Sequence, residues 1–177
     1  MLTQLEQKSS EVILENPYWQ YRKDTYSLPS GKEGDYHYVH TPGSVFVIPE
    51  TDEGKLVLLK QYRYLNRRES IEFIGGGIKS GMSPEVAARA ELLEEAGIIA
   101  ESMIKIGEFN PFNGVTDEIC TVFVAKGLSF GAPKPDDSEE FERLEHTPLV
   151  LREMIARGRI WDGMTLAAFA LYDSLNR

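Results

Sequence analysis

The chain has 177 residues, of which 42% are hydrophobic and 27% charged, a composition typical of one globular domain with a proper core. Its net charge of −9 at pH 7 argues against nucleic acid and against an anionic membrane surface as partners. No apolar run is long enough to span a bilayer, and the first ten residues lack the apolar segment of a signal peptide. Cys120 is the single cysteine, which excludes an internal disulfide and favours a reducing cytoplasm.

Strand-forming segments fill the first part of the chain. They are rich in aromatic and β-branched residues and are separated by turn-forming Asn, Pro and Gly residues. We expect strands at residues 12–14, 19–26, 36–40, 44–48, 55–62 and 70–74. Residues 1–10 are polar, and there we expect a frayed or short helical end. The sequence therefore predicts five or six strands before residue 75.

A glycine-rich loop of Gly75, Gly76, Gly77 and Gly81 follows and leads into a helix. A glycine loop of this kind lets the backbone approach a ligand closely. Ser83 is a good N-cap, Pro84 suits the first helical position, and Gly97 follows the last periodic residue. We therefore expect a loop at the glycines and a helix that begins after Ser83 and ends at Gly97.

Three glutamates of this helix, Glu91, Glu94 and Glu95, are three and four residues apart, which places Glu91 beside both others on one face. Like charges so placed repel one another. A hard divalent cation bound between them, Mg²⁺ or Mn²⁺, would make the arrangement of carboxylates favourable. Three glutamates alone are typical of a solvated acidic face. The preceding glycines favour a metal site, because their carbonyls can lie beside the carboxylates.

The same stretch resembles the conserved box of the Nudix hydrolases, which runs Gly, five residues, Glu, seven residues, Arg-Glu-apolar-any-Glu-Glu-any-Gly-apolar. The matching residues are Gly76, Glu91, Leu92, Glu94, Glu95, Gly97 and Ile98. Two positions depart, with Met82 in place of the first glutamate and Ala90 in place of the arginine. Arg89 is one residue away, about 100° around the helix, and is not equivalent. The resemblance implies that Glu91, Glu94 and Glu95 bind metal and that Glu94 and Glu95 serve catalysis.

The resemblance extends to the ADP-ribose pyrophosphatase branch of that family, which carries Gln-Tyr-Arg and then Glu-Leu-Pro-Ala-Gly before the box. Here residues 61–63 keep Gln-Tyr-Arg, whereas residues 72–76 lack the proline. This implies that Arg63 and Glu72 lie near the substrate and that the Gly75 carbonyl binds metal. By residue type alone, Arg63 could clamp a phosphate bidentately or could be a surface arginine at the end of a strand.

Two further strands are expected after the box, at residues 103–109 and 118–125, with a loop between them. In the branch resembled, this loop lies near the sugar or the second phosphate, which implies a substrate contact for Phe112 and Gly114. Phe112 could stack on a base, and a plain hairpin loop is the equal alternative.

Residues 131–145 are polar and acidic, a pattern typical of a mobile solvated loop. In the branch resembled, the acidic loop at this place supplies the catalytic base. The resemblance therefore implies Glu139, Glu140 or Glu142 as the base, and the sequence does not choose among them.

Two helices are predicted towards the end of the chain. Thr147 and Pro148 begin one that ends before Gly158, and Asp162 begins another that reaches about Leu175.

The resemblance implies a single α/β domain. Its core at residues 44–177 would be an α/β/α sandwich with a mixed β-sheet. Residues 1–43 would form an N-terminal antiparallel β extension like that of the dimeric branch, which implies a homodimer.

The function expected is Mg²⁺-dependent hydrolysis of a nucleoside diphosphate linked to a sugar, such as ADP-ribose or a nucleotide sugar. The products would be a nucleoside monophosphate and a sugar phosphate, and the partner is a small nucleotide. Loss of residues that support a metal site typically lowers activity about 10–100-fold, so Met82 and Ala90, in place of the glutamate and the arginine, predict a slower enzyme.

The same two departures also motivate a hypothesis of another class, a Nudix-fold module that binds a nucleotide metabolite without turning it over. The retained, self-repelling glutamates argue against that rival, and a domain for protein contacts alone has no specific support.

Overall fold

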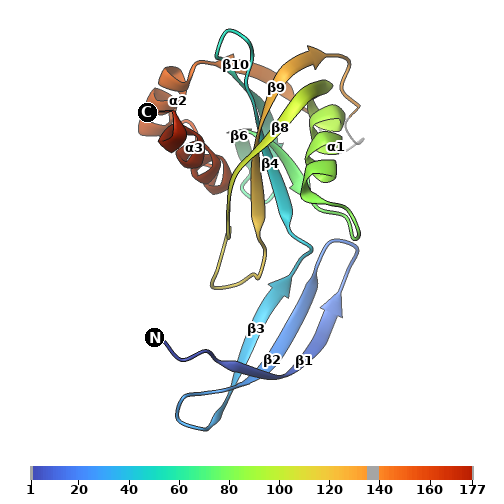
Figure 1. Cartoon of the computed structure of the whole chain (residues 1–177), viewed down its shortest axis with the longest axis vertical. Helices are drawn as coiled ribbons and strands as arrows, with labels where there is room; N and C mark the ends of the chain where they lie inside the picture. The colour runs from blue at the N-terminus through green and yellow to red at the C-terminus, as the bar shows by residue number, and fades with distance from the viewer. Residues whose placement is uncertain (1, 135–139, 177) are drawn as a thin grey trace.

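A computed structural model describes residues 2–134 and 140–176 (Figure 1). Its strands are β1 (Glu6–Glu15), β2 (Gln20–Ser27), β3 (Glu33–His40), β4 (Ser44–Pro49), β5 (Leu56–Arg63), β6 (Arg68–Glu72), β7 (Ile74–Gly77), β8 (Ile98–Phe109), β9 (Cys120–Phe130) and β10 (Glu142–His146). Its helices are α1 (Pro84–Ala96), α2 (Pro148–Ala156) and α3 (Gly163–Leu175).

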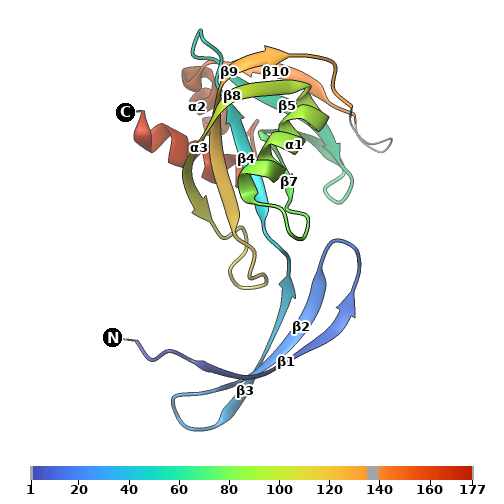
Figure 2. The ribbon, with the colours of Figure 1, turned by 45° about the vertical axis from the view of Figure 1, so that its right-hand side comes forward.

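The first three strands form an antiparallel sheet in the order β1-β2-β3, which extends away from the rest of the molecule (Figures 1 and 2). The N-terminal β extension is therefore present. Residues 2–5 form no regular element. The expectation of a frayed or helical end at residues 1–10 is wrong for residues 6–10, because β1 begins at Glu6. This polar segment shows no strand pattern of its own, and it is extended because its backbone pairs with β2, with Glu6 opposite Ser27 and Ser10 opposite Asp24.

The body holds a four-stranded sheet in the order β7-β4-β9-β8 and a three-stranded sheet in the order β10-β5-β6. Strands β4 and β9 run parallel, whereas β7 pairs with β4 and β8 pairs with β9 in antiparallel fashion. The predicted mixed sheet is confirmed.

Both faces of the four-stranded sheet are covered, because successive side chains of a strand point to opposite faces. Phe46 and Ile48 of β4 belong to a core with Phe169 and other residues of α2 and α3. Val45 and Val47 belong to a second core with Leu92 and other residues of α1. Helix α1 therefore lies on one side of the sheet and α2 and α3 on the other, as an α/β/α sandwich requires (Figure 2).

The box helix has the predicted ends. The Ser83 hydroxyl accepts a hydrogen bond from the Val86 N–H, and Pro84 is the first helical residue. Gly97 ends the helix in the left-handed conformation with φ of 65°. A Cβ on Gly97 would lie 2.5 Å from the Gly131 carbonyl oxygen, so this position needs glycine for both its conformation and its space.

The glycines at residues 75–77 lie in strand β7, so the expectation of a loop there is wrong. Their lack of side chains serves a close packing contact instead. A Cβ on Gly75 would lie 2.4 Å from the Val45 carbonyl oxygen and 2.4 Å from the Phe46 ring. Glycine therefore lets β7 pair with β4 at this point.

Further element boundaries differ from the sequence expectations. The expected strand at residues 70–74 is divided into β6 and β7, so seven strands precede α1 where five or six were predicted. Strand β8 begins at Ile98, directly after the helix, and β9 continues to Phe130, because the two pair along most of their length. The segment 131–145, expected to be loop, contains the start of β10 at Glu142.

Cys120 is fully buried at the start of β9. Burial of the thiol is the main cause that raises the pKa of Cys120 to about 11, so the thiol is protonated at neutral pH. In the part of the chain that the structure describes, no helix has the length and apolar character needed to cross a membrane.

Candidate functional site

The acidic face of α1 lies against the glycines of β7. The Gly75 N–H donates a hydrogen bond to Glu95 Oε2 at 3.3 Å. A Cβ on Gly76 would lie 2.5 Å from the Glu91 carboxylate, so that carboxylate rests directly on the glycine backbone. Glu91 and Glu95 are half-buried, whereas Glu94 is exposed. The structure therefore brings Gly75, Gly76, Glu91 and Glu95 together.

These residues fit a hard divalent cation. Mg²⁺ prefers oxygen ligands, keeps several waters and is usually bound through one or two carboxylates together with substrate phosphates. Glu91 and Glu95 provide two carboxylates beside a strand whose carbonyls are also oxygen donors. Within residues 2–134 and 140–176, no group of three or more His, Cys, Asp and Glu side chains is arranged to hold a metal. The arrangement therefore suits a cation whose remaining ligands are backbone, water and substrate.

Arg63 and Glu72 form a bidentate ion pair at the ends of β5 and β6. Arg63 Nε donates to Glu72 Oε1 at 2.9 Å, and an Nη of Arg63 donates to Glu72 Oε2. The Glu72 side chain is 1% exposed and that of Arg63 is 46% exposed. Gln61 Nε2 also donates to Glu72, at 3.4 Å. Glu72 is thus a buried support that fixes the orientation of Arg63, while part of the guanidinium faces solvent.

The electrostatic surroundings of Arg63 connect it to the box helix. Hydrogen bonding to Glu72 is the main cause that raises the pKa of Arg63, and the charges of Asp162 and Glu95 raise it further. Arg63 therefore lies within electrostatic range of Glu95 on the box helix. That Arg63 and Glu72 lie near the substrate stays a prediction.

Sequence reasoning treated Asp162 only as a helix cap and gave Thr165 no role. Asp162 does cap α3, since its carboxylate accepts a hydrogen bond from the Thr165 N–H at 2.7 Å. In addition, the buried Thr165 hydroxyl accepts from the Phe73 N–H at 3.3 Å, directly after Glu72. The start of α3 thereby supports the strand that carries Glu72. In the sequence, Asp162-Gly163 signals the start of a helix. Only the tertiary structure brings Asp162 close to Arg63.

Phe112 and Gly114 belong to a different group of contacts. The Phe112 carbonyl accepts hydrogen bonds from the N–H groups of Val115 and Thr116, each at 2.9 Å, and its side chain is 61% exposed. The Gly114 carbonyl accepts a hydrogen bond from the Tyr36 hydroxyl at 3.3 Å. The bonds to Phe112 lie within the loop, whereas the Tyr36 contact connects the loop to the N-terminal sheet.

Two of the three glutamates suggested as base, Glu140 and Glu142, lie in the part of the chain that the structure describes. Glu142 lies on β10 opposite Lys60 of β5 and forms an ion pair with it. The hydrogen bond to Glu142 is the main cause that raises the pKa of Lys60. Glu140 is exposed, and Glu139 lies outside the described residues. The Lys60 ion pair makes Glu142 the weaker candidate.

The two departures from the box are not compensated by the neighbouring arginine. Arg89 Nε donates to Glu85 at 3.0 Å, and an Nη of Arg89 donates to the Ala100 carbonyl at 2.8 Å. Met82 is 39% exposed before the start of α1, and Ala90 is half-buried on the helix. Arg89 is therefore engaged away from the position that Ala90 occupies, as its place on the helix predicted.

Comparisons with known proteins agree with this geometry. The family model described as NUDIX domain matches residues 40–168. The chain is 36% identical to "ADP-ribose pyrophosphatase" of Bacillus subtilis over 143 residues, which cover 80% of this chain and 77% of that protein. It is 35% identical to "Methanol dehydrogenase activator" of Bacillus methanolicus, with 82% and 80% covered. A solved structure, "Crystal structure of ADP compounds hydrolase", superposes with a TM-score of 0.84 at 17% identity, covering 99% of this chain and 95% of that one.

The contact between Gly76 and Glu91 makes a testable prediction about metal binding. We expect Gly76→Ala to weaken Mg²⁺ or Mn²⁺ binding about 10–100-fold, because the added methyl group displaces the Glu91 carboxylate. Gly77→Ala is the matched control, since no atom of the described residues lies within 4 Å of a Cβ there. Calorimetric titration of both variants measures the effect. Equal affinities for the two variants would contradict this account of the site.

Proposed function

Because the chain belongs to the Nudix family and is a pyrophosphohydrolase, we propose that it hydrolyses a nucleoside diphosphate linked to a sugar. The class of substrate includes ADP-ribose and nucleotide sugars, and the products are a nucleoside monophosphate and a sugar phosphate. The proposal depends mainly on the guanidinium of Arg63. Buried Glu72 holds it through two hydrogen bonds, and the charge of Glu95 acts on it. A guanidinium so oriented suits bidentate contact with a phosphate. The names of the relatives support the same class of substrate.

The proposed cofactor is Mg²⁺, or Mn²⁺ in its place, held by Glu91, Glu94, Glu95 and the Gly75 carbonyl. The bound cation neutralises the diphosphate, polarises a P–O bond and lowers the pKa of a bound water. The close approach of β7 to Glu91 and Glu95 supports this set of ligands. Glu94 reaches the site only if its exposed side chain turns towards it when metal and substrate are present.

The remaining steps fall to residues outside the box. We assign Arg63 to the phosphates, and Phe112 and Gly114 to the base or the sugar. A glutamate of the acidic segment accepts the proton of the attacking water, with Glu139 and Glu140 favoured over Glu142. The ion pair with Lys60 is the reason, because it would have to break before Glu142 could act as base.

The proposed assembly is a homodimer formed through the sheet β1-β2-β3. The ten residues of β1 are exposed along the whole strand, including Val12, Ile13 and Leu14 at 46%, 47% and 53%. A small sheet needs a covered apolar face for stability, and a second copy of the chain can supply that cover.

Product formation from ADP-ribose and a panel of nucleotide sugars with Mg²⁺ tests the proposed reaction. We expect turnover by the wild type, loss of turnover in Glu95→Gln, and about 10–100-fold faster turnover in the double variant Met82→Glu, Ala90→Arg. The gain is expected because the double variant restores the supporting residues of the family box.

A wild type that binds nucleotide with metal but yields no product would instead support the rival binding module. Turnover that survives in Glu95→Gln would contradict the proposed metal site.

Light scattering during size-exclusion chromatography tests the homodimer. We expect a particle of twice the 20.0 kDa of one chain, and a monomer for Leu14→Asp, which places a charge on the exposed face of β1. Leu175→Asp, at the similarly exposed end of α3, is the control and should remain dimeric. A monomeric wild type, or a dimeric Leu14→Asp variant, would contradict the proposal.

A further inference from the structure

The end of β3 is joined by backbone hydrogen bonds to the loop between β8 and β9, here called the 110–117 loop. The Val39 N–H donates to the Val115 carbonyl at 2.8 Å, and the Asp117 N–H donates to the Val39 carbonyl at 3.3 Å. Val39 and Thr116 thereby form an isolated parallel bridge. The last residues of the N-terminal sheet therefore hold the 110–117 loop as a neighbouring strand would.

Two side-chain contacts strengthen this junction. His40 Nδ1 lies 2.7 Å from Asp117 Oδ2, and the Tyr36 hydroxyl donates to the Gly114 carbonyl at 3.3 Å. The contact is a hydrogen bond to the carboxylate in the His40 tautomer that carries its proton on Nδ1. Both residues of the His40–Asp117 pair are partly exposed, at 34% and 42% of their side chains. The contacts come from β3 and fix both the middle and the end of the loop.

The 110–117 loop is also closed internally. The Phe112 carbonyl accepts two hydrogen bonds, from Val115 and Thr116, and Asn110 Nδ2 donates to the Thr116 carbonyl at 3.1 Å. A loop held in this way is preorganised, which lowers the conformational entropy that a ligand must remove on binding. Its most exposed large side chain is that of Phe112, at 61%. The loop therefore holds the backbone of Phe112 in place and leaves the residue exposed.

The residues that follow the loop are connected through Ser44 to the glycines of β7. The Ile119 carbonyl accepts a hydrogen bond from the Ser44 N–H at 3.1 Å, and the Ser44 hydroxyl donates to Glu118. Ser44 in turn pairs with Gly77 of β7. The 110–117 loop thus approaches the same end of the sheet as the candidate metal site.

We propose that the end of β3 positions the 110–117 loop for substrate, with His40 and Asp117 as positioning residues that act through Phe112 and Gly114. The inference rests on the proposed function, because that function assigns the loop to the base or the sugar. It gives the N-terminal sheet a role within each chain in addition to dimerisation. Loosening the junction should weaken substrate binding and leave the chemical step at the metal site unchanged.

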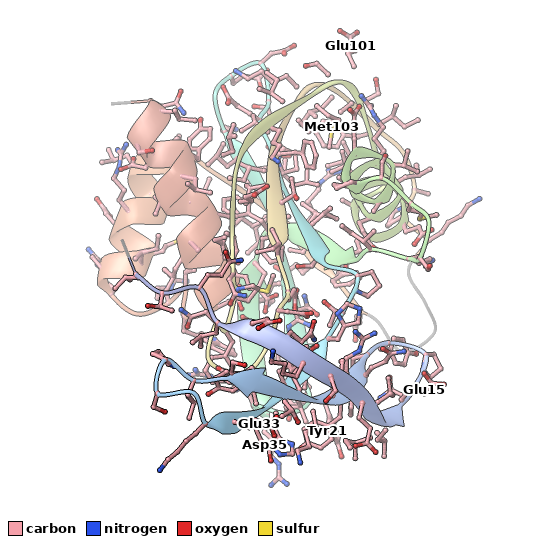
Figure 3. The ribbon with its side chains drawn as sticks, turned by 60° about the horizontal axis from the view of Figure 1, so that its bottom comes forward. Glu15, Tyr21, Glu33, Asp35, Glu101 and Met103 are labelled. Atoms are coloured by element: carbon pink, nitrogen blue, oxygen red, sulfur yellow. The ribbon has the colours of Figure 1, made fainter. Side chains whose placement is uncertain are left out.

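Kinetics with the preferred substrate test the proposal. We expect His40→Ala and Asp117→Ala each to raise KM about two- to fivefold, the effect that a partly exposed ion pair supports, with kcat unchanged. Asp117→Asn keeps an acceptor for His40 and should retain most of the wild-type KM. Lys23→Ala is the matched control, because Lys23 of β2 forms a similarly exposed ion pair with Asp35 of β3, 2.9 Å apart. Figure 3 shows Asp35 on the N-terminal sheet.

A double-variant cycle separates positioning from general destabilisation. Because His40 acts in part through Phe112, the increase in KM caused by His40→Ala should be smaller when Phe112 is already alanine. Additive effects, or an equal increase in Lys23→Ala, would overturn the inference.

Hydrogen exchange of the peptide that covers the 110–117 loop supplies a readout independent of activity. Exchange should be faster in His40→Ala than in the wild type and unchanged in Lys23→Ala. Unchanged exchange in His40→Ala would overturn the inference even if the enzyme is active. A wild type that neither binds nor hydrolyses the substrate panel would contradict the proposed function, and the loop would then have no substrate role to serve. If hydrogen exchange in such an inactive protein still depended on His40, the junction between β3 and the loop would exist but would have no role in substrate binding.

Discussion

The candidate site depends on how closely strand β7 approaches its two neighbours, β4 on one side and α1 on the other. Neither approach leaves room for a side chain, since a Cβ on Gly75 would overlap Val45 and one on Gly76 would overlap Glu91. Because the glycines have no Cβ, a backbone N–H can reach Glu95 and a carboxylate can rest on the strand. Glycine in a strand costs conformational entropy on folding. Here the glycines permit the close approach of β7 to β4 and α1 that forms the candidate site.

This packing also bears on the two residues of the family box that the chain lacks. An arginine at position 90 and a glutamate at position 82 would support the carboxylates from the helix side. The backbone of β7 supports the carboxylates from the sheet side. The Gly75 N–H donates to Glu95, and the Glu91 carboxylate packs against Gly76. Arg63, fixed by buried Glu72, adds a positive charge near Glu95. Backbone groups cannot be lost by substitution, so this half of the support persists when Met82 and Ala90 replace charged residues.

The sequence predicted those features that local chemistry determines. Ser83, Pro84 and Gly97 mark the ends of α1 because caps act within one turn of the chain. The sequence did not predict features that depend on distant partners. The polar start of β1 is extended only because β2 lies beside it, and Glu142 pairs with Lys60, more than eighty residues earlier. The glycines of β7 read as a loop because their strand partner was not visible.

The most direct test of the account is a count of Mn²⁺ bound per chain, measured by electron paramagnetic resonance in the wild type and in Glu91→Gln. If β7 and α1 together form a metal site, the wild type binds Mn²⁺ and Glu91→Gln loses most of that binding, because the carboxylate that rests on Gly76 loses its charge. Equal Mn²⁺ binding by both proteins would contradict the account, since the cation would then lie elsewhere.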